Sequence, residues 1–178
     1  MRQLDGTGMK RLHREWRRRT TGRLALVLDD VQGPFNVGAI IRTAAALRVD
    51  DVWLAGNTPD PHDVKVGKTA LGTQRYLTFQ RAETTIAAIE AARGAGYRVV
   101  GLELADGARP LHELDPVDAI CVVVGHEDRG CSPATLDACD EVAFVPLLGK
   151  VGSLNVATAT SIALYELRRQ HWHDPAEP

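Results

Sequence analysis

Short apolar runs alternate with helical patterns along most of the chain, and this alternation limits the possible folds more than any other feature. The clearest runs are L-A-L-V-L at residues 24–28 and A-I-C-V-V-V at residues 119–124. Continuous apolar runs of this length are typical of strands buried on both faces of a parallel sheet. Helices between such strands pack on the two faces of the sheet. The sequence therefore predicts an α/β fold with a mostly parallel sheet and helices on both faces.

Each element is predicted from its apolar spacing and its flanking residues. Strands are expected at residues 24–28, 51–55, 76–79, 97–102, 119–124 and 142–145. Helices are expected at residues 10–19, 37–47, 65–71, 84–93, from Ser132 onward, and 156–170. Ligands of such folds bind at loops that leave the carboxyl ends of strands. Three loops of this kind have unusual compositions, and they cover residues 29–38, 125–132 and 146–155.

The loop at residues 146–155 has the highest density of glycine and polar residues. Between an apolar strand and a long apolar helix it contains Gly149, Lys150, Gly152, Ser153 and Asn155. Glycines allow the backbone to approach a ligand closely, and Ser153 and Asn155 stand at positions typical of helix caps. A well-capped joint between a strand and a helix would explain each residue singly. Their density is what indicates a binding loop.

The loop at residues 29–38 leads into a helix that carries Gly38 and Arg42 on one face. Asn36 is expected to cap this helix. The space above Gly38 would let the Arg42 guanidinium swing over a ligand, and apolar neighbours favour an arginine with a fixed partner such as a phosphate. An ordinary cap beside a surface arginine is the alternative.

The loop after residue 124 has the sequence G-H-E-D-R-G, with Gly125 and Gly130 at its ends. These glycines would allow backbone donors and acceptors to face a ligand. Glu127 is a candidate to bind a hydroxyl or amino group, or to orient Arg42. For Asp128 we favour a solvated acidic turn.

Two glycine patterns imitate nucleotide-binding motifs. V-G-K-T-A at residues 66–70 ends like a phosphate-binding loop, but His62 occupies the position of the first glycine, and a Pro-Asp loop precedes it instead of a strand. Gly94 and Gly96 follow a helix, so they are expected to end it and not to open a dinucleotide site. The sequence therefore argues against an NTPase and against the usual glycine loop for a nucleoside cofactor.

Charge divides the chain into a basic arm and an acidic body. The 178 residues are 44% hydrophobic and 25% charged, as is typical of one globular domain. Residues 1–23 carry eight Lys/Arg against two acidic residues, a net charge of +6, whereas the remainder carries thirteen basic and twenty-one acidic residues, a net charge of −8. A basic arm favours an anionic partner such as RNA, and a solvated tail is the alternative.

Cysteine usage and hydropathy indicate the compartment. The three cysteines show no C-x-x-C spacing, which predicts free thiols in a reducing environment. We find no apolar run of membrane-spanning length, and the N-terminus is too charged for a signal peptide. We therefore expect a cytoplasmic protein with no membrane partner and no metal. The expected division is a basic arm, a single domain and a short polar tail, at residues 1–23, 24–170 and 171–178.

Three motifs follow one another in a fixed order, namely N-x-G-x-x-x-R at residues 36–42, G-x-E-x-x-G at residues 125–130 and P-L-x-G-x-x-x-S-L-N-V at residues 146–156. Together they resemble the signature motifs of the TrmH (SpoU) branch of the SPOUT superfamily, whose members are S-adenosylmethionine-dependent RNA ribose 2′-O-methyltransferases. The resemblance extends over roughly residues 24–168 and includes K-T-A-L-G at residues 68–72. Each motif is weak alone, but three in register are specific.

The resemblance implies a C-terminal trefoil knot, a homodimer, S-adenosylmethionine as cofactor and a ribose 2′-hydroxyl of tRNA or rRNA as substrate. It implies that Arg42 lies near the partner's cofactor and activates the hydroxyl. A guanidinium is a poor base, so a role in holding the adjacent phosphate is equally open. The residues implied to act in the catalytic site are Arg42, Asn36, Glu127, Ser153 and Asn155. The residues implied to surround the cofactor are Leu104, Gly125, Val145, Leu147 and Leu154.

The sequence also departs from the family's pattern, and two other functions remain open. Gln74 stands where a glutamate is expected after K-T-A-L-G. We expect neither the separate N-terminal substrate-binding domain of many rRNA-directed members nor a long basic C-terminal extension, which leaves the RNA target open. One alternative is a catalytically silent RNA-binding module, against which the presence of Arg42, Asn36 and Asn155 argues. The other is a base-directed methyltransferase, and the S-L-N of the last motif favours the ribose branch over it.

Overall fold

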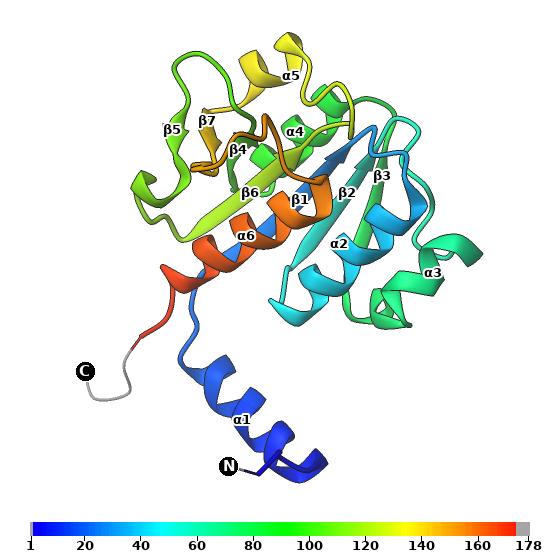
Figure 1. Ribbon diagram of the computed structural model, residues 1–178, viewed down its shortest axis with the longest axis vertical. Coiled ribbons are helices and arrows are strands. Elements are labelled where there is room, and N and C mark those ends of the chain that lie inside the picture. Colours follow the sequence, from blue (N-terminus) through cyan, green and yellow to red (C-terminus); the bar gives the residue numbers. More distant parts are fainter. Residues whose placement is uncertain (1, 174–178) are drawn as a thin grey trace.

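The computed structural model describes residues 2–173, and a seven-stranded sheet forms its centre (Figure 1). All paired strands are parallel, in the order β3-β2-β1-β6-β4-β7-β5. The strands are β1 (Arg23–Asp29), β2 (Asp51–Ala55), β3 (Thr78–Ala82), β4 (Arg98–Leu102), β5 (Arg109–Pro110), β6 (Ala119–Val124) and β7 (Glu141–Phe144). The helices are α1 (Gly6–Arg18), α2 (Pro34–Ala46), α3 (Val64–Ala70), α4 (Thr85–Gly94), α5 (Pro133–Ala138) and α6 (Val156–Arg169), with short 3₁₀ helices η1 (Thr73–Tyr76) and η2 (Leu111–Glu113). The predicted parallel α/β fold is confirmed.

Side chains of the central strands alternate between two hydrophobic cores. In β1, Leu24, Leu26 and Leu28 belong to one core, whereas Ala25 and Val27 belong to the other. Residues of α2, α3 and α6 complete the first core, and residues of α4 and α5 complete the second, so that helices cover both faces (Figure 1). Because both faces are covered, every residue of the run L-A-L-V-L is buried. This burial explains why the run shows no polar alternation.

Helix α2 begins at Pro34, earlier than the predicted start at residue 37. Gly33 is the N-cap, and Pro34 occupies the first helical position, where a missing N–H costs no hydrogen bond. Asn36 lies inside the first turn, so the prediction that it caps the helix is wrong. Its side chain is left free to bind the neighbouring loops.

The edge of the sheet is where the predicted strands fit least well. The strand expected at residues 76–79 is β3 (Thr78–Ala82), and η1 occupies Thr73–Tyr76 before it. No β3 residue is fully buried, so its sequence lacks a continuous apolar run. In contrast, β2 and β6 lie in the central part of the sheet and have the predicted bounds.

The two described ends of the chain bind each other near the end of α6. Thr20 and Trp172 form an isolated antiparallel bridge, and the His173 N–H donates to the Arg19 carbonyl oxygen at 2.8 Å. Beyond this bridge α1 projects away from the sheet, and none of its residues is buried (Figure 1). Residues 174–178, most of the predicted polar tail, lie outside the described residues.

Helices α2 and α3 approach each other closely at Gly38. A Cβ on Gly38 would lie 2.0 Å from the Thr69 Oγ1 and 2.4 Å from the Val66 carbonyl oxygen. The Thr69 hydroxyl also donates to the Phe35 carbonyl oxygen at 3.0 Å. Because α3 fills the space above Gly38, the expectation that the Arg42 guanidinium swings over this glycine is wrong.

Substitution of Gly38 tests this close approach. Gly38→Ala should lower the free energy of unfolding by about 1–3 kcal/mol, because the added methyl group overpacks the contact between the helices. Gly67→Ala in α3 is the matched control, since a Cβ there meets no atom within 4 Å. Alanine is favoured over glycine in a helix by ~1 kcal/mol, so we expect this control to be slightly stabilised. Urea unfolding measures both, and a Gly38→Ala protein as stable as wild type would contradict the close contact.

Candidate active site

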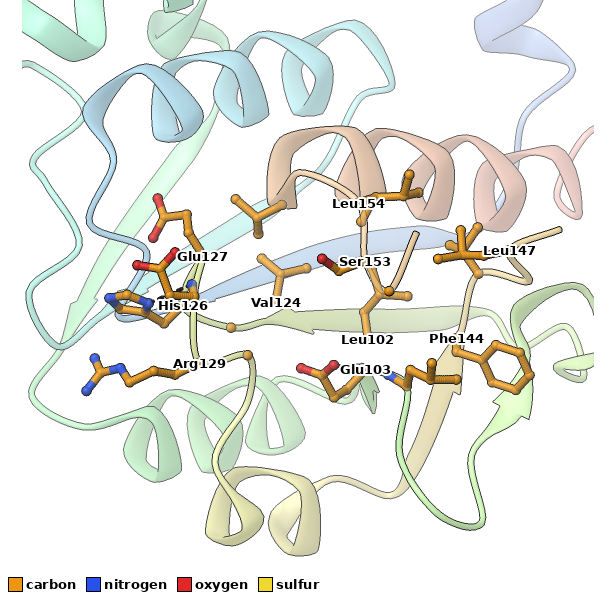
Figure 2. A pocket seen from close by; sticks show the side chains of 18 residues that line it. Leu102, Glu103, Val124, His126, Glu127, Arg129, Phe144, Leu147, Ser153 and Leu154 are labelled. Carbon is orange, nitrogen blue, oxygen red and sulfur yellow. Dashed lines mark hydrogen bonds between the residues drawn. The ribbon is translucent and has the colours of Figure 1, made fainter. Parts of the chain in front are cut away.

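A cavity of about 290 Å³ opens where β4, β6 and β7 end at the carboxyl edge of the sheet. The polar side chains of Glu127, His126 and Arg129 gather at one end, and the apolar side chains of Leu147 and Phe144 lie at the other (Figure 2). The carboxyl edge of a parallel sheet is where α/β folds bind their ligands. The lining residues belong to four segments of the chain, 102–104, 124–130, 144–147 and 152–159.

The loop G-H-E-D-R-G forms a tight turn at the polar end of the cavity. Its backbone closes on itself, because the His126 N–H donates to the Gly130 carbonyl oxygen (3.2 Å) and the Gly130 N–H donates to the His126 carbonyl oxygen (2.8 Å). A Cβ on Gly125 would lie 2.3 Å from the Gly130 carbonyl carbon, and Gly130 has φ +64°. A side chain is excluded at the first position and strained at the second. Both glycines of the motif are therefore required for the turn itself.

Glu103 holds the far end of this turn. Its carboxylate accepts from the Cys131 N–H (2.9 Å) and from the Leu104 N–H (3.1 Å). A Cβ on Gly130 would lie 2.1 Å from the Glu103 Oε2, so this carboxylate fills the space beside the glycine. Glu103 belongs to none of the three sequence motifs. The only signal available was an acidic residue directly after a buried strand.

A chain of side-chain hydrogen bonds connects the three sequence motifs. The Glu127 Oε1 accepts from the Asn36 Nδ2 (3.0 Å) and from the Gly33 N–H (2.7 Å). The Asn36 Oδ1 in turn accepts from the Asn155 Nδ2 (3.0 Å). The Asn155 Oδ1 then accepts from the Ala157 N–H (2.9 Å) at the start of α6. Asn36 therefore joins the G-x-E-x-x-G turn to the loop that precedes α6.

The surroundings of Glu127 favour its charged form. Burial by itself raises the pKa of this carboxyl, but hydrogen bonds from Asn36, from its own backbone and from the N–H groups of Gly33 and Gln32 outweigh burial and lower the pKa. A lowered pKa in the folded state means that the resulting stabilisation is present above about pH 4.5 and is lost as the pH falls further. At neutral pH Glu127 is a fixed carboxylate that positions loops, and within residues 2–173 no hydrogen bond or salt bridge joins it to Arg42.

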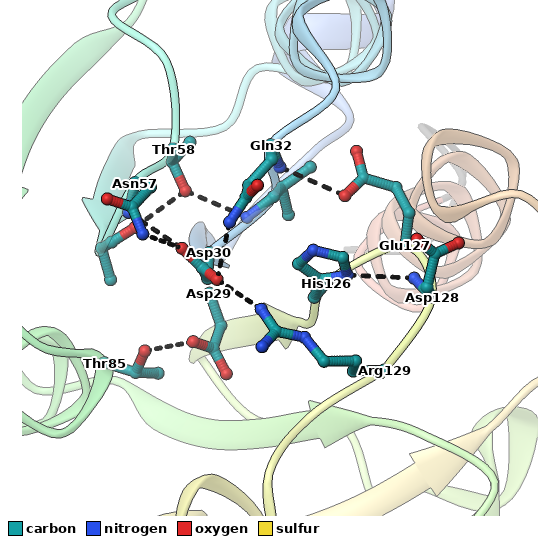
Figure 3. A network of polar contacts seen from close by, with 12 residues as sticks. Asp29, Asp30, Gln32, Asn57, Thr58, Thr85, His126, Glu127, Asp128 and Arg129 are labelled. Carbon is teal, nitrogen blue, oxygen red and sulfur yellow. Dashed lines mark hydrogen bonds and ion pairs between the residues drawn. The ribbon is translucent and has the colours of Figure 1, made fainter.

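Arg129 ties the same turn to the end of β1 (Figure 3). Its Nη2 donates to the Asp30 Oδ2 at 2.8 Å. Asp30 also accepts from the backbone N–H and the side-chain amide of Asn57, both at 3.0 Å, and from the Gln32 Nε2 at 3.1 Å. These bonds, and first among them the Asn57 backbone bond, lower the Asp30 pKa. Because the Arg129 side chain is 67% exposed, this ion pair orients the loop more than it stabilises the fold.

Most of the predicted site residues meet in the wall of one cavity. Glu127 and Ser153 line it. Asn36 and Asn155 do not line it, and they hold Glu127 and the start of α6 in place by hydrogen bonds. Arg42 does not line it either. The residues expected to surround a cofactor all line the cavity, and they are Leu104, Gly125, Val145, Leu147 and Leu154.

The loop at residues 146–155 differs from its prediction in two details. Asn155 caps α6 as expected, but Ser153 is an exposed residue of the cavity wall and not a cap. Neither Gly149 nor Gly152 has a positive φ, and a Cβ on either would meet no atom within 4 Å. Gly152 lines the cavity, whereas Gly149 does not.

Arg42 is exposed on α2, and within residues 2–173 its side chain makes no hydrogen bond and no salt bridge. The partner that its apolar neighbours suggested is therefore not found in the described part of the chain. Ile40, Ile41 and Ala44 face the core instead, because residues one or two positions apart on a helix point to different sides. The guanidinium is available to bind a group outside this chain.

The cavity combines an apolar end with fixed polar groups. Leu147 and Phe144 lie at the apolar end, and the carboxylates of Glu127 and Glu103 lie with backbone groups elsewhere in the wall (Figure 2). This combination suits a ligand that has both a flat apolar ring and hydroxyl or amino groups. Residues 2–173 contain no group of three His, Cys, Asp or Glu arranged to hold a metal, and no helix with the length and hydropathy needed to cross a membrane.

The fold and the cavity define an α/β protein with a cavity at the carboxyl edge of a parallel sheet, where folds of this class bind their ligands. Residues 23–165 match the SpoU rRNA Methylase family, and the chain belongs to this family.

Relatives and solved structures agree with this assignment. The chain is 35% identical over 148 residues to the 23S rRNA (guanosine(2553)-2′-O)-methyltransferase RlmP of Bacillus subtilis, a match that covers 83% of this chain and 59% of that protein. The AdoMet-bound rRNA methyltransferase from Sinorhizobium meliloti is 31% identical with a TM-score of 0.79, over 87% of this chain and 59% of that one. A structure described as "Structural insights into the 2-OH methylation of C/U34 on tRNA" is 29% identical with a TM-score of 0.75, over 84% of this chain and 96% of that one. The chain spans about half the length of the curated relatives that it matches.

Two substitutions of Asn155 separate its cap from its link to Asn36. Asn155→Ala removes both and should lower the free energy of unfolding by about 1 kcal/mol or more. Asn155→Asp keeps an acceptor for the Ala157 N–H but loses the Nδ2 donor to Asn36, so it should lower the free energy of unfolding by a smaller amount. Urea unfolding should therefore give a lower free energy of unfolding for the alanine variant than for the aspartate variant. Equal losses of unfolding free energy in the two variants would mean that the hydrogen bond to the Ala157 N–H adds no stability beyond the hydrogen bond to Asn36.

Proposed function

We propose that this chain transfers a methyl group from S-adenosylmethionine to a ribose 2′-hydroxyl of tRNA or rRNA. The observation that carries the proposal is the hydrogen-bonded chain Glu127–Asn36–Asn155, which joins all three family motifs around one cavity. Membership of the SpoU rRNA Methylase family and the activity named for RlmP support it. The cytoplasm, where free thiols persist and these RNAs are modified, is the compartment that we propose.

The cavity fits the cofactor by its chemistry. The proposed binding residues are Leu104, Gly125, Val145, Leu147 and Leu154, all in the cavity wall. The four apolar side chains suit the adenine ring, and at Gly125 the backbone itself forms part of the wall. When bound, S-adenosylmethionine supplies a methyl group on a positively charged sulfur. We also propose that residues 146–155 form part of a C-terminal trefoil knot, for which family membership is the support.

Transfer to a hydroxyl is an in-line displacement, so holding the ribose in place supplies much of the rate. The hydroxyl must also lose its proton. We propose that Arg42 binds the phosphate next to the reacting ribose and stabilises the developing alkoxide, because a planar guanidinium donates two parallel hydrogen bonds to such a group. Its pKa above ~12 makes direct proton removal by Arg42 the weaker alternative. Asn36, Glu127, Ser153 and Asn155 would shape the site around it.

The position of Arg42 supports a homodimer. It does not line the cavity of its own chain, and it is exposed without a partner in residues 2–173. We propose that Arg42 of one copy completes the cavity of another copy. The basic side of α1, within the arm of residues 1–23, would contact RNA phosphates, which position an RNA without selecting its sequence. Residues 24–170 would then form the methyltransferase domain.

Valine substitutions in one loop test the cofactor site. Gly152→Val should weaken binding of S-adenosylhomocysteine by about tenfold or more, because the new side chain enters the cavity wall. Gly149→Val is the matched control in the same loop, and its affinity should stay near that of wild type, since Gly149 does not line the cavity. Isothermal titration calorimetry measures both affinities. Equal affinities in all three proteins would remove this loop from the cofactor site.

Arg42 offers the sharpest test of the catalytic proposal. Arg42→Ala and Arg42→Lys should remain folded because Arg42 is exposed, and they should bind S-adenosylhomocysteine as wild type does because the proposed contact of Arg42 is to the RNA phosphate and not to the cofactor. Both should slow methyl transfer to RNA by a factor on the order of a hundred or more, the scale expected for a positioned electrostatic or proton-transfer group. Single-turnover methylation with saturating cofactor measures this loss.

The two Arg42 variants contradict different parts of the proposal. Near-normal transfer in the lysine variant would mean that charge alone suffices and that the two-pronged geometry is unimportant. Near-normal transfer in the alanine variant would place the catalytic site elsewhere. A wild-type protein that binds S-adenosylhomocysteine and RNA but methylates no ribose would favour the silent RNA-binding module.

A further inference from the structure

The basic residues that follow the arm divide into a paired group and an unpaired group. Residues 31–49 and 64–82 contain no acidic residue and six basic ones, which are Arg42, Arg48, Lys65, Lys68, Arg75 and Arg81. Within residues 2–173 none of these six forms a salt bridge, whereas six of the other seven basic residues do, namely Arg93, Arg98, Arg109, Arg129, Arg168 and Arg169. Arg81 binds two backbone carbonyl oxygens instead. Five unpaired cations are therefore available to an anion from outside the chain.

The two acid-free segments fold beside each other on one face of the sheet. Helix α3 and the 3₁₀ helix η1 both pack against α2 (Figure 1). Phe35 and Arg42 are two helical turns apart and are both exposed on the side of α2 that faces away from the core. Lys65 lies one turn before Thr69, whose hydroxyl binds the Phe35 carbonyl oxygen. The exposed residues of this region form what we call the α2–η1 surface, and they are Phe35, Arg42, Lys65, Arg75 and Tyr76.

Arg75 and Tyr76 form a flat platform on the α2–η1 surface. The Arg75 guanidinium lies 4.8 Å from the Tyr76 ring centroid, and its Nη2 donates to the Tyr76 hydroxyl at 2.7 Å. Tyr76 nevertheless remains 65% exposed, so most of its ring is in contact with solvent. Aromatic rings and guanidinium planes are the groups on which proteins stack unpaired nucleobases. The platform therefore suits a nucleobase, and the neighbouring cations suit the phosphates that flank it.

A tight turn holds the platform in place. Leu71 and Gly72 are two successive residues with left-handed backbone, at φ +51° and +78°. The Thr73 hydroxyl donates to the Ala70 carbonyl oxygen at 2.6 Å, and Leu77, directly after the platform, packs against the first core. A leucine with positive φ is strained, and such strain concentrates at functional sites. Because the turn is fixed at both ends, little conformational freedom is lost when a ligand binds.

We infer that the α2–η1 surface binds a single-stranded segment of the substrate RNA, with one base stacked on Tyr76 and the flanking phosphates bound by Arg75 and Lys65. This inference rests on the proposed function, in which Arg42 of the same surface binds the phosphate next to the reacting ribose. The segment is single-stranded because the bases of a duplex stack on one another and leave no free face for a protein ring. Stacking accepts every base, so Tyr76 positions the RNA without selecting its sequence.

An acidic protein surface is the other candidate occupant of the α2–η1 surface. Carboxylates of such a surface would pair with Arg75 and Lys65, but they offer no flat group for the exposed ring of Tyr76. RNA supplies both a phosphate for each cation and a flat base for the ring. The combination of unpaired cations with an exposed, guanidinium-backed ring therefore favours RNA.

Two substitutions of Tyr76 test the stacking. The probe is a fluorescein-labelled single-stranded RNA of about 12 nucleotides and mixed sequence, whose binding to the full chain is followed by fluorescence anisotropy. Tyr76→Ala should raise the dissociation constant by about tenfold, whereas Tyr76→Phe keeps the ring and should stay within about twofold of wild type. Both variants should remain folded because Tyr76 is exposed. An alanine variant that binds as tightly as wild type, or a phenylalanine variant as weak as the alanine one, would overturn the inference.

Two arginine variants with the same change in charge test the phosphate contacts. Arg75→Gln removes an unpaired cation of the α2–η1 surface, and it should flatten the dependence of log Kd on log salt concentration by about 0.7. Arg93→Gln is the matched control, because Arg93 lies on α4, which covers the other face of the sheet, and is already paired with Asp140. Its salt dependence should equal that of wild type. A salt dependence that is unchanged in Arg75→Gln would contradict the inferred contact.

Methylation assays separate this inference from the proposed function. With tRNA and rRNA from cells that lack this gene as substrates, Tyr76→Ala should raise KM for RNA by about tenfold and leave kcat near that of wild type, because Tyr76 positions the RNA away from the reacting ribose. A fall in kcat at unchanged KM would overturn the inference. If the wild-type chain methylates no ribose, the proposed function fails, while the oligonucleotide titration still decides the role of Tyr76. A Tyr76→Ala chain that sediments as a smaller species than wild type would assign the surface to a second copy and overturn the inference.

Discussion

The hydrogen bonds of Asn36 hold the candidate site together. A single amide side chain offers a donor and an acceptor, so Asn36 can bind the Glu127 carboxylate on one side and the Asn155 amide on the other. A carboxylate in its place would repel Glu127, and an apolar residue would leave both partners unsatisfied. Because Glu127 also fixes Gly33, and Asn155 caps α6, this one bridge sets the relative positions of three loops. The shape of the cavity depends on it.

The central sheet was predictable because its signal is local. Strands such as β2 and β6 are buried on both faces, and burial on both faces produces an uninterrupted apolar run with clear ends. The edge strand β3 lacks such a run, so its position was predicted too early in the chain. Asn36 was misassigned for a related reason. Its residue type suits a cap, but Pro34 at the first helical position moves the helix start three residues earlier.

The site was predictable to the extent that motifs mark loops at the carboxyl edge of the sheet. Glu127 and Asn155 were found in this way, but their mutual connection through Asn36 arises only when strands distant in sequence become neighbours. Glu103 has no motif around it, and its importance comes from the Cys131 backbone, which lies far along the chain. Gly38 was assigned to a ligand because nothing local distinguishes a glycine that faces a substrate from one that faces another helix.

The role that we propose for Arg42, in the cavity of another copy, requires a rigid surface around it, since a misplacement of about 1 Å can cost roughly a hundredfold in rate. Arg168 supplies part of this rigidity. It is buried on α6, and burial lowers its pKa, yet its donors are satisfied by the backbone carbonyl oxygens of Thr21, Gly22, Leu47 and Arg48. These bonds connect α6 to the end of α2 and to the base of the arm. If Arg42 completes the cavity of another copy as proposed, then α2, α6 and the base of the arm meet that copy as parts of one body.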